Sequence, residues 1–398
     1  MKTNRMTRCG AAVAMAALGV GVWAGAATIT WTGATSTDWA TGSNWTGGPG
    51  VPQAGDDVVI DGTAGRDVAL SSSTPALGTV TISGNRTLTF NGWDTQLVAY
   101  VLDVKSTGTI THTANGAYNT GIGAANGVNR VNIQVGSVLV ELGGRITADA
   151  GGWQGYTYSG TTEGGYWAHV EDIAASRVMS GPGAGSSGTA GSGGAYGGAG
   201  GRSTWDSVNN ATYGLLAYPT GAGSGGGHEW DLTSNYSDGG GAVYITATTV
   251  SIAGAISANG QDGDGNRGGG GSGGSIFINI GTGGFSLTGS LSANGGDDSV
   301  SAYAGYGGGG GGGRIAVWKK LPGAIQSALM AGTDPSSFPE LILAYTMAGV
   351  TVNGGPVGTN GNTAGSDGTF FFGRVPEPAS AALLGFAALA LLRRRQRQ

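Results

Sequence analysis

The stretch VSIAGAISAN, Val250–Asn259, decides the fold expected of this chain. Apolar residues alternate in it with small or polar ones, a Gly interrupts the alternation, and an Ala-Asn pair closes it. Two other stretches repeat the pattern: VELGGRITAD at Val140–Asp149 and FSLTGSLSAN at Phe285–Asn294. Alternation with a period of two predicts a β-strand, the Gly a kink, and the Asn or Asp a turn that closes the unit.

Each of the last two copies follows a Gly pair and a run of β-forming residues. These leading segments are Gly240–Ile245 and Gly273–Ile278, and Gly312–Val317 opens a third. Units that recur at such a period bury their apolar stripes by stacking on one another. We therefore expect an all-β protein with a β-solenoid or β-helix-like stack and Gly-rich loop inserts. A β-sandwich or an irregular layered β fold remains the alternative.

Short alternating β-formers, separated by Gly, Asn, Asp and Ser, predict further strands. They lie at 57–60, 80–82, 88–90, 97–104, 131–135 and 138–142. Gly323–Met330 is the one segment between residues 27 and 374 that favours a helix.

The composition is unusual, with 84 Gly among 398 residues and only 11% charged residues. The Gly-rich inserts are 181–201, 221–227, 268–274 and 307–313. We interpret them as flexible spacers, since Gly loses the most entropy on ordering. The alternative is close packing of backbone on backbone. A single Cys excludes an intramolecular disulfide framework, and a formal net charge of −5 without basic runs in the body argues against nucleic-acid binding.

Three Trp residues mark the region that follows the N-terminus: Trp31, Trp39 and Trp45. Turn residues separate them, and Pro49, Pro52 and the acidic pair Asp56-Asp57 follow. The stretch resembles the W-x-NW-x-P-x-D opening of many secreted β-repeat and autotransporter-like proteins. We expect a small β-cap over the first end of the stack with the Trp side chains in its core; stacking on carbohydrate is the alternative.

Residues 1–26 have the three parts of an export signal. Basic residues come first, an apolar stretch from about Ala11 to Trp23 follows, and Ala24 and Ala26 provide the small residues that signal peptidase requires. The protein is therefore expected outside the cytoplasm.

The C-terminus carries a second targeting signal. Val375, Pro376, Glu377 and Pro378 precede an uncharged apolar segment, 379–392, and an Arg-rich end. As a helix this segment covers about 21 Å, less than the ~30 Å hydrocarbon core of a bilayer. Arg393, Arg394 and Arg395 are expected to stay on the cytoplasmic side. The two Pro residues keep the motif extended, as a processing enzyme requires.

Residues 375–398 resemble the PEP-CTERM protein-sorting tail of Gram-negative bacteria. The resemblance implies processing by a membrane enzyme of the exosortase type, a transient stay in the inner membrane, and a final place on the cell surface or outside the cell. It further implies an association with extracellular polysaccharide and biofilm. The same tail has been labelled an ice-binding-protein C-terminal domain, a name that says little about activity.

The chain is thus divided into five parts. A signal (1–26) precedes a Trp-rich β region (27–130), a Gly-rich β-repeat region (131–320), a β region with linker (321–374) and the sorting tail (375–398). Removal of the signal and of residues 379–398 leaves 12 basic against 24 acidic residues.

Residues with catalytic or metal-binding potential are sparse. His112, His169 and His228 stand far apart, without metal-binding spacing. Asp262, Asp264 and Asn266 place oxygen ligands at alternate positions, as calcium loops do, but Arg267 and Gly273 depart from the EF-hand pattern. We expect no cofactor, with calcium at this loop as the alternative.

These features predict an exported, non-enzymatic surface or matrix protein. The alternatives are a carbohydrate- or ice-binding module and a polysaccharide-acting β-helix enzyme. Three Thr-x-Thr segments bear on ice binding, at 28–30, 79–81 and 87–89, but their irregular spacing predicts no flat ladder.

Overall fold

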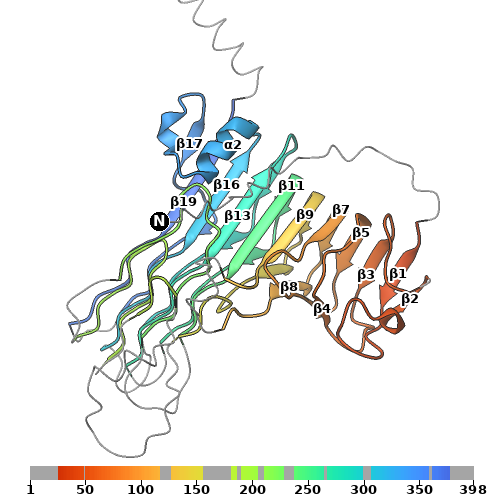
Figure 1. The fold of residues 1–398 in the computed structure, drawn as a ribbon, viewed down its shortest axis with the longest axis horizontal. Coiled ribbons are helices and arrows are strands. Elements are labelled where there is room, and N and C mark those ends of the chain that lie inside the picture. Colours follow the sequence, from red (N-terminus) through yellow and green to blue (C-terminus); the bar gives the residue numbers. More distant parts are fainter. Residues whose placement is uncertain are drawn as a thin grey trace, which may run out of the picture.

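A computed structural model describes residues 26–48, 50–116, 127–155, 181–185, 190–204, 210–227, 237–263, 267–298, 306–357 and 361–376. The protein is mostly β, as expected, and is built on two large sheets whose strands are mainly parallel (Figure 1). Residues 1–25 of the predicted export signal and residues 377–398 of the predicted sorting tail lie outside the described residues.

The twelve-stranded sheet has the order β17-β19-β16-β13-β11-β9-β7-β5-β3-β1-β2, with β14 paired to β11. Its strands are β1 (Thr28–Trp31), β2 (Trp45–Thr46), β3 (Asp57–Ile60), β5 (Leu77–Ile82), β7 (Leu97–Val104), β9 (Val131–Val140), β11 (Ala242–Ile252), β13 (Ser275–Ile280), β14 (Phe285–Leu287), β16 (Arg314–Lys319), β17 (Ile342–Ala344) and β19 (Thr369–Arg374). The expected regions 27–130, 131–320 and 321–374 all contribute strands to this one sheet.

The seven-stranded sheet has the order β18-β15-β12-β10-β8-β6-β4. Its strands are β4 (Val68–Leu70), β6 (Thr87–Phe90), β8 (Thr109–His112), β10 (Arg145–Thr147), β12 (Ala255–Ser257), β15 (Ser290–Ser292) and β18 (Val350–Thr351). Among the described residues, two 3-10 helices, η1 (Gly42–Asn44) and η3 (Pro335–Ser337), and one α-helix, α2 (Gly323–Met330), complete the elements. The helix predicted at 323–330 is confirmed.

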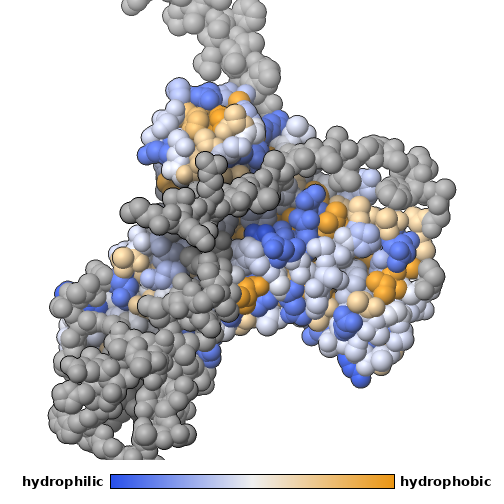
Figure 2. Space-filling model, in the orientation of Figure 1, coloured by the Kyte–Doolittle hydropathy of each residue, from blue (hydrophilic) through white to orange (hydrophobic). Residues whose placement is uncertain are grey.

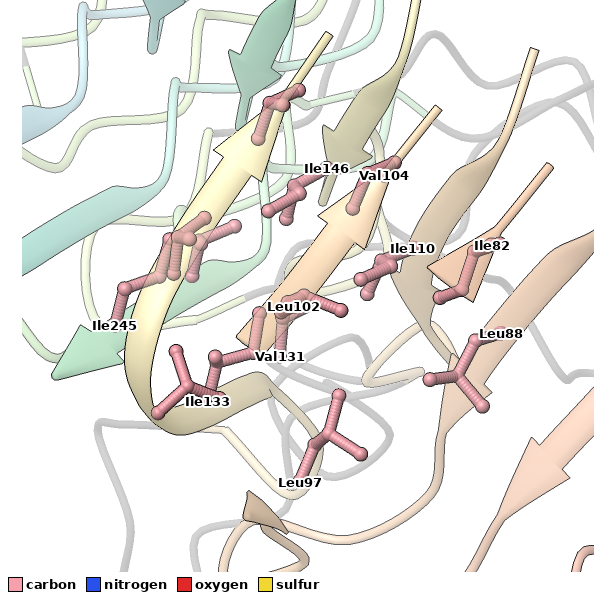
Figure 3. Packing of buried hydrophobic residues seen from close by; sticks show 14 of the residues in the cluster. Ile82, Leu88, Leu97, Leu102, Val104, Ile110, Val131, Ile133, Ile146 and Ile245 are labelled. Atoms are coloured by element: carbon pink, nitrogen blue, oxygen red, sulfur yellow. The ribbon is translucent and has the colours of Figure 1, made fainter. Parts of the chain in front are cut away.

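The hydrophobic core fills the space between the two sheets. Along the chain, β5 of the large sheet is followed by β6 of the small one, and the same alternation recurs through β7–β8, β9–β10 and β11–β12. Figure 3 shows Leu88, Ile110 and Ile146 of the small sheet among side chains of the large one. All three are fully buried. Alternate residues thus supply the core and the outer faces, as the period of two predicts.

The repeat is confirmed in its register. Ile146, Ile256 and Leu291 lie side by side in the small sheet, as the alignment of the three copies predicts. The first half of the first copy is offset, because Val140 pairs with Ile252 rather than with Val250. Four residues join β9 to β10 but only two join β11 to β12, and this difference shifts the register by two.

Two predicted strands, 131–135 and 138–142, merge into one continuous strand, β9, which ends at Val140, so that residues 141 and 142 lie in the turn that follows. Gly136 lies between the two predicted strands, where the sequence pattern predicts a separating turn residue. A Cβ there would meet the carbonyl oxygen of Tyr100 on the neighbouring β7 inside 3.0 Å. Gly136 therefore allows close approach of the backbone within a strand rather than a turn.

The Gly-rich inserts form a bundle of extended segments beyond the N-terminal ends of β11, β13 and β16 (Figure 1). The segment 306–313 has a period of three in its hydrogen bonds. Its amides at 308 and 311 donate to Gly191 and Gly194, those at 309 and 312 to Thr363 and Ser366, and those at 310 and 313 to Gly296 and Ala293. Three residues per turn without internal hydrogen bonds is the geometry of a polyproline II helix.

The segment 306–313 also accepts hydrogen bonds from three further segments, through the amides of Gly201 and Gly198, of Gly270 and Gly273, and of Gly355. It therefore lies among six neighbours. A Cβ at any position from 308 to 313 would meet a carbonyl oxygen inside 3.0 Å. A chain enclosed on all sides cannot carry side chains, and this accounts for the unbroken Gly run at 307–313.

The interpretation of the inserts as flexible spacers is therefore wrong for the described residues. Those of 190–201, 221–227, 268–274 and 307–313 are almost all buried, and their amides pair with carbonyls of other segments. Buried backbone groups must find partners, and here each segment supplies them to its neighbours.

The Trp residues near the N-terminus form a packed cluster at the end of the large sheet. Trp31, Trp39 and Trp45 are 0, 3 and 7% exposed. Trp45 makes edge-to-face contacts with both others, at ring-centroid distances of 4.8 and 4.7 Å. The core role is confirmed, and stacking of these rings on carbohydrate is excluded by their burial.

Helix α2 covers the outer face of the large sheet at its other end. Ile325 and Leu329 of the helix pack with Phe277, Trp318 and Phe371 in a second apolar cluster. Figure 2 shows apolar side chains at the surface of the part that carries α2 and β17, where Ile342 and Tyr345 are exposed.

The bundle predicts a sharp difference between two Gly→Ala substitutions. Gly310→Ala is expected to lower the free energy of unfolding by about 3 kcal/mol or more, because its Cβ would press on the carbonyl oxygen of Gly271. Gly323→Ala, at the first turn of α2 with nothing within 4 Å, is expected to change it by about 1 kcal/mol or less. Denaturant unfolding of both variants measures the difference. Equal stabilities would contradict the enclosed position of residue 310.

Candidate functional site

The outer face of the small sheet carries a regular array of hydroxyl groups. On five neighbouring strands, β6, β8, β10, β12 and β15, two residues of each strand point outward on either side of a buried Leu or Ile. Strand pairing aligns them in two columns. The first column is Thr87, Thr109, Arg145, Ala255 and Ser290, and the second is Thr89, Thr111, Thr147, Ser257 and Ser292. Eight of these ten residues bear a hydroxyl, and we call the ten residues the hydroxyl face.

The outer face of the large sheet is more mixed, although the same units build it. Its outward pairs are Thr28 and Thr30 on β1, Asp57 and Val59 on β3, Thr79 and Thr81 on β5, Val101 and Asp103 on β7, Ser137 and Leu139 on β9, and Thr249 and Ser251 on β11. Seven of these twelve residues bear a hydroxyl, but acidic and aliphatic side chains interrupt both columns. The preference of strands for Thr acts on both sheets, and the small sheet differs in its second column, in which all five residues bear a hydroxyl.

A ladder of Asx side chains borders the hydroxyl face. The side-chain oxygen of Asp149 accepts the amide of Asn259 at 2.6 Å, that of Asn259 accepts the amide of Asn294 at 2.9 Å, and that of Asn294 accepts the amide of Asn353 at 2.9 Å. The residues predicted to close each unit by an Asx turn therefore link one unit to the next. These hydrogen bonds help to fix the register of each strand relative to the next strand in the small sheet.

The three Thr-x-Thr segments singled out in the sequence build no ladder with one another, as expected: those at 28–30 and 79–81 belong to the large sheet, with β3 between them, and 87–89 belongs to the small sheet. The ladder of the small sheet instead pairs 87–89 in register with 109–111. Sequence reasoning missed Thr109 and Thr111 because spacing was compared along the chain. The sequence feature that could have revealed the array is the position of each Thr or Ser directly before or after the central Leu or Ile of its unit.

The sorting motif begins where the fold ends. Val375 and Pro376 follow β19 directly, and Val375 packs against the apolar cluster under α2. Glu377, Pro378 and the Arg residues 393–395 lie outside the described residues. Of the two signal-cleavage residues, Ala26 is described and exposed, and Ala24 lies outside the described part.

The predicted calcium loop is described only in part. Asp262 is exposed, and its carboxylate accepts the amide of Asp297 at 2.9 Å. Asp264 and Asn266 lie outside the described residues. Within the described ranges, no three His, Cys, Asp or Glu side chains come together as a metal site. Calcium at this loop stays a prediction.

His112 lies buried where the small sheet meets the Gly bundle. Its Nδ1 donates to the carbonyl of Thr113 at 2.8 Å, and its Nε2 accepts the amide of Ala242 at 3.2 Å. The ring is therefore neutral, with the proton on Nδ1. Burial lowers the pKa of His112 to about 4, only partly opposed by the bond to Thr113. His169 and His228 lie outside the described residues.

Asp238 has a perturbed pKa in the same part of the bundle. Its carboxylate accepts the amide of Gly155 at 2.9 Å, but burial raises its pKa to about 6. Because the folded-state pKa lies above the ordinary Asp value, acidification favours the folded state through this group. Asp238 and His112 therefore act in opposite directions as pH falls.

The geometry of His112 predicts a pH-dependent stability. Its folded-state pKa of about 4 lies below the usual 6.5, so its contribution is complete above pH ~6.5 and declines as pH falls toward ~4. Between pH 7.5 and 4.5 the loss due to this one group is about 2.5 kcal/mol. In His112→Gln the amide oxygen can still accept the Ala242 amide and does not titrate, so the loss should shrink by that amount. Urea unfolding at both pH values measures it; an unchanged pH profile would contradict the buried neutral ring.

Comparisons with protein-family models, curated proteins and solved structures find no match. Among the described residues, no helix has the length and apolar character needed to cross a bilayer.

Proposed function

We propose that the protein is an exported, non-enzymatic surface or matrix protein that a C-terminal signal delivers to the outside of the inner membrane. Signal peptidase would remove the first 26 residues. An exosortase-type enzyme would act at Val375–Pro378 while the apolar segment 379–392 holds the precursor in the membrane. Its surroundings outside the cell would be the extracellular polysaccharide of a biofilm.

The observation that carries the proposal is the place of the motif relative to the fold. The last strand, β19, ends at Arg374 and pairs with β16 over six residues. The motif starts at the next residue. A cut at or beyond the motif therefore removes no strand, and the body is released from the membrane with its fold complete.

The body is suited to a scaffolding role. We propose that the alternation of strands between the two sheets is that of a β-solenoid, in which each unit contributes one strand to each sheet. The Gly bundle then stiffens the side of the stack from which the long inserts emerge. Such a body presents broad faces at a fixed orientation, which a matrix component requires.

Substitution in the motif tests the sorting step. In a bacterium that encodes an exosortase, the native chain should reach the surface or medium with the mass expected after loss of both ends. Glu377→Ala should accumulate in the membrane fraction with its C-terminal segment intact. Cell fractionation and intact mass measure both outcomes.

Glu340→Ala, an exposed residue between η3 and β17, is the matched control and should be processed like the native chain. Processing of Glu377→Ala at the native rate would contradict the role of the motif. Native protein found in the cytoplasm with both ends present would overturn the proposal as a whole.

A further inference from the structure

We propose that the hydroxyl face binds ice. The inference concerns the outer face of the small sheet and does not depend on the sorting tail. It starts from the two columns of five residues on β6, β8, β10, β12 and β15, all of them partly or fully exposed.

The face repeats in two dimensions. Neighbouring strands lie ~4.8 Å apart, and outward residues two positions apart on one strand are separated by ~6.7 Å. The buried residues between the columns, Leu88, Ile110, Ile146, Ile256 and Leu291, are all 0% exposed, so the five strands rest on one continuous layer. The hydroxyl groups therefore stand at regular intervals on a common level.

The side chains of the face are held in place before any ligand arrives. Thr is stiff at χ1 because two heavy atoms branch from its Cβ. The Ser257 hydroxyl donates to the hydroxyl of Thr147 at 3.0 Å and lies 2.8 Å from the carboxylate of Asp149. Little conformational entropy remains to be lost on binding, which favours even a ligand that offers weak individual contacts.

The charge and the size of the side chains on the face indicate which class of ligand it can bind. Arg145 is the one charged residue among the ten, so a charged polymer finds no complementary surface. Apart from Arg145 the side chains are short, and none is aromatic, so a single glycan chain has neither a groove nor a ring to stack on. A flat, rigid and uncharged surface whose oxygen atoms repeat on the scale of a few ångströms fits both the hydroxyls and the intervening Thr methyl groups. Ice is such a surface.

The face has a gradient in side-chain character. Thr87, Thr89, Thr109 and Thr111 form a complete block on two adjacent strands, and Thr147 extends the second column. Toward β15 the hydroxyls come from Ser, which lacks the methyl group. We therefore place the strongest ice contact over β6 and β8.

The full-length protein should inhibit ice recrystallisation and enter a slowly grown ice hemisphere. Thr89→Lys and Thr111→Lys place a long, hydrated side chain inside the block and should lower both activities by about tenfold or more. Thr79→Lys and Thr81→Lys make the same change on the outer face of the large sheet, in the strand that precedes β6, and should leave both activities within about twofold of the native protein.

Thermal melts identify any variant that fails to fold. If a Lys variant unfolds, Thr89→Ser and Thr111→Ser keep the hydroxyl and should lower the activity partially. Exclusion of the native protein from ice would overturn the proposal. Equal losses from substitutions on the two sheets would do so as well, since ice would then not distinguish the faces. Either result leaves the sorting of the protein unaffected.

Discussion

In-register pairing of the parallel strands β11, β13, β16 and β19 is the constraint on which the rest of the structure depends. Val243, Ile276, Ile315 and Phe370 lie side by side along these strands. The Gly residues that precede each strand are therefore brought to the same level. The ladder continues past the ends of the strands, since Ser275 donates to Gly241, Arg314 to Gly274 and Thr369 to Gly313. A slip of one residue would turn apolar side chains outward and misalign the bundle at the same time.

The Gly bundle depends on the sheets for its stability. Ordering the backbone of one residue costs ~1–2 kcal/mol of free energy through lost conformational entropy, and the cost is larger for Gly than for any other residue. One intramolecular hydrogen bond returns a net ~0.5–1.5 kcal/mol. With one amide bond per residue and no side chains to bury, these segments are close to balance by themselves. Because the ends of these segments are fixed in the sheet, ordering the rest of each segment costs less conformational entropy. The ordered bundle is therefore favoured.

Much of the sheet was predictable from the sequence, and the bundle was not. Alternation located β3 and β7 closely, the one segment that favoured a helix is α2, and the repeats gave the register of Ile146, Ile256 and Leu291. Local pattern failed for Gly136, because a Gly within a strand and a Gly at a turn look alike when the neighbouring Tyr100 is unknown. It failed for the run 307–313 for the same reason. Whether a Gly run is a spacer or the centre of a bundle depends on six neighbours that come from distant parts of the chain. His112 likewise acquires its role only when residue 242 folds against it.

The alignment of the strands that carry the hydroxyl face follows from which links between the two sheets vary in length from unit to unit. Within the stack, the links from the small sheet back to the large one vary widely in length: those from β4 to β5 and from β6 to β7 are short, at 71–76 and 91–96, whereas that from β10 to β11 runs from 148 to 241. The links from the large sheet to the small one have two to four residues between β5 and β12. Three of them have the same length of four residues, and in each the third residue, Asn85, Thr107 or Gly143, has a positive φ of 59°, 65° or 87°; in the first of them Gly84 also has a positive φ, of 64°.

In each of these turns the amide of the fourth residue donates to the carbonyl of the first. A link of constant length at this corner keeps β6, β8 and β10 in the same phase relative to β5, β7 and β9. Insertions at the opposite corner leave that phase unchanged. The bundle could therefore grow by insertion of Gly-rich segments while the outward positions of β6, β8 and β10 stayed aligned.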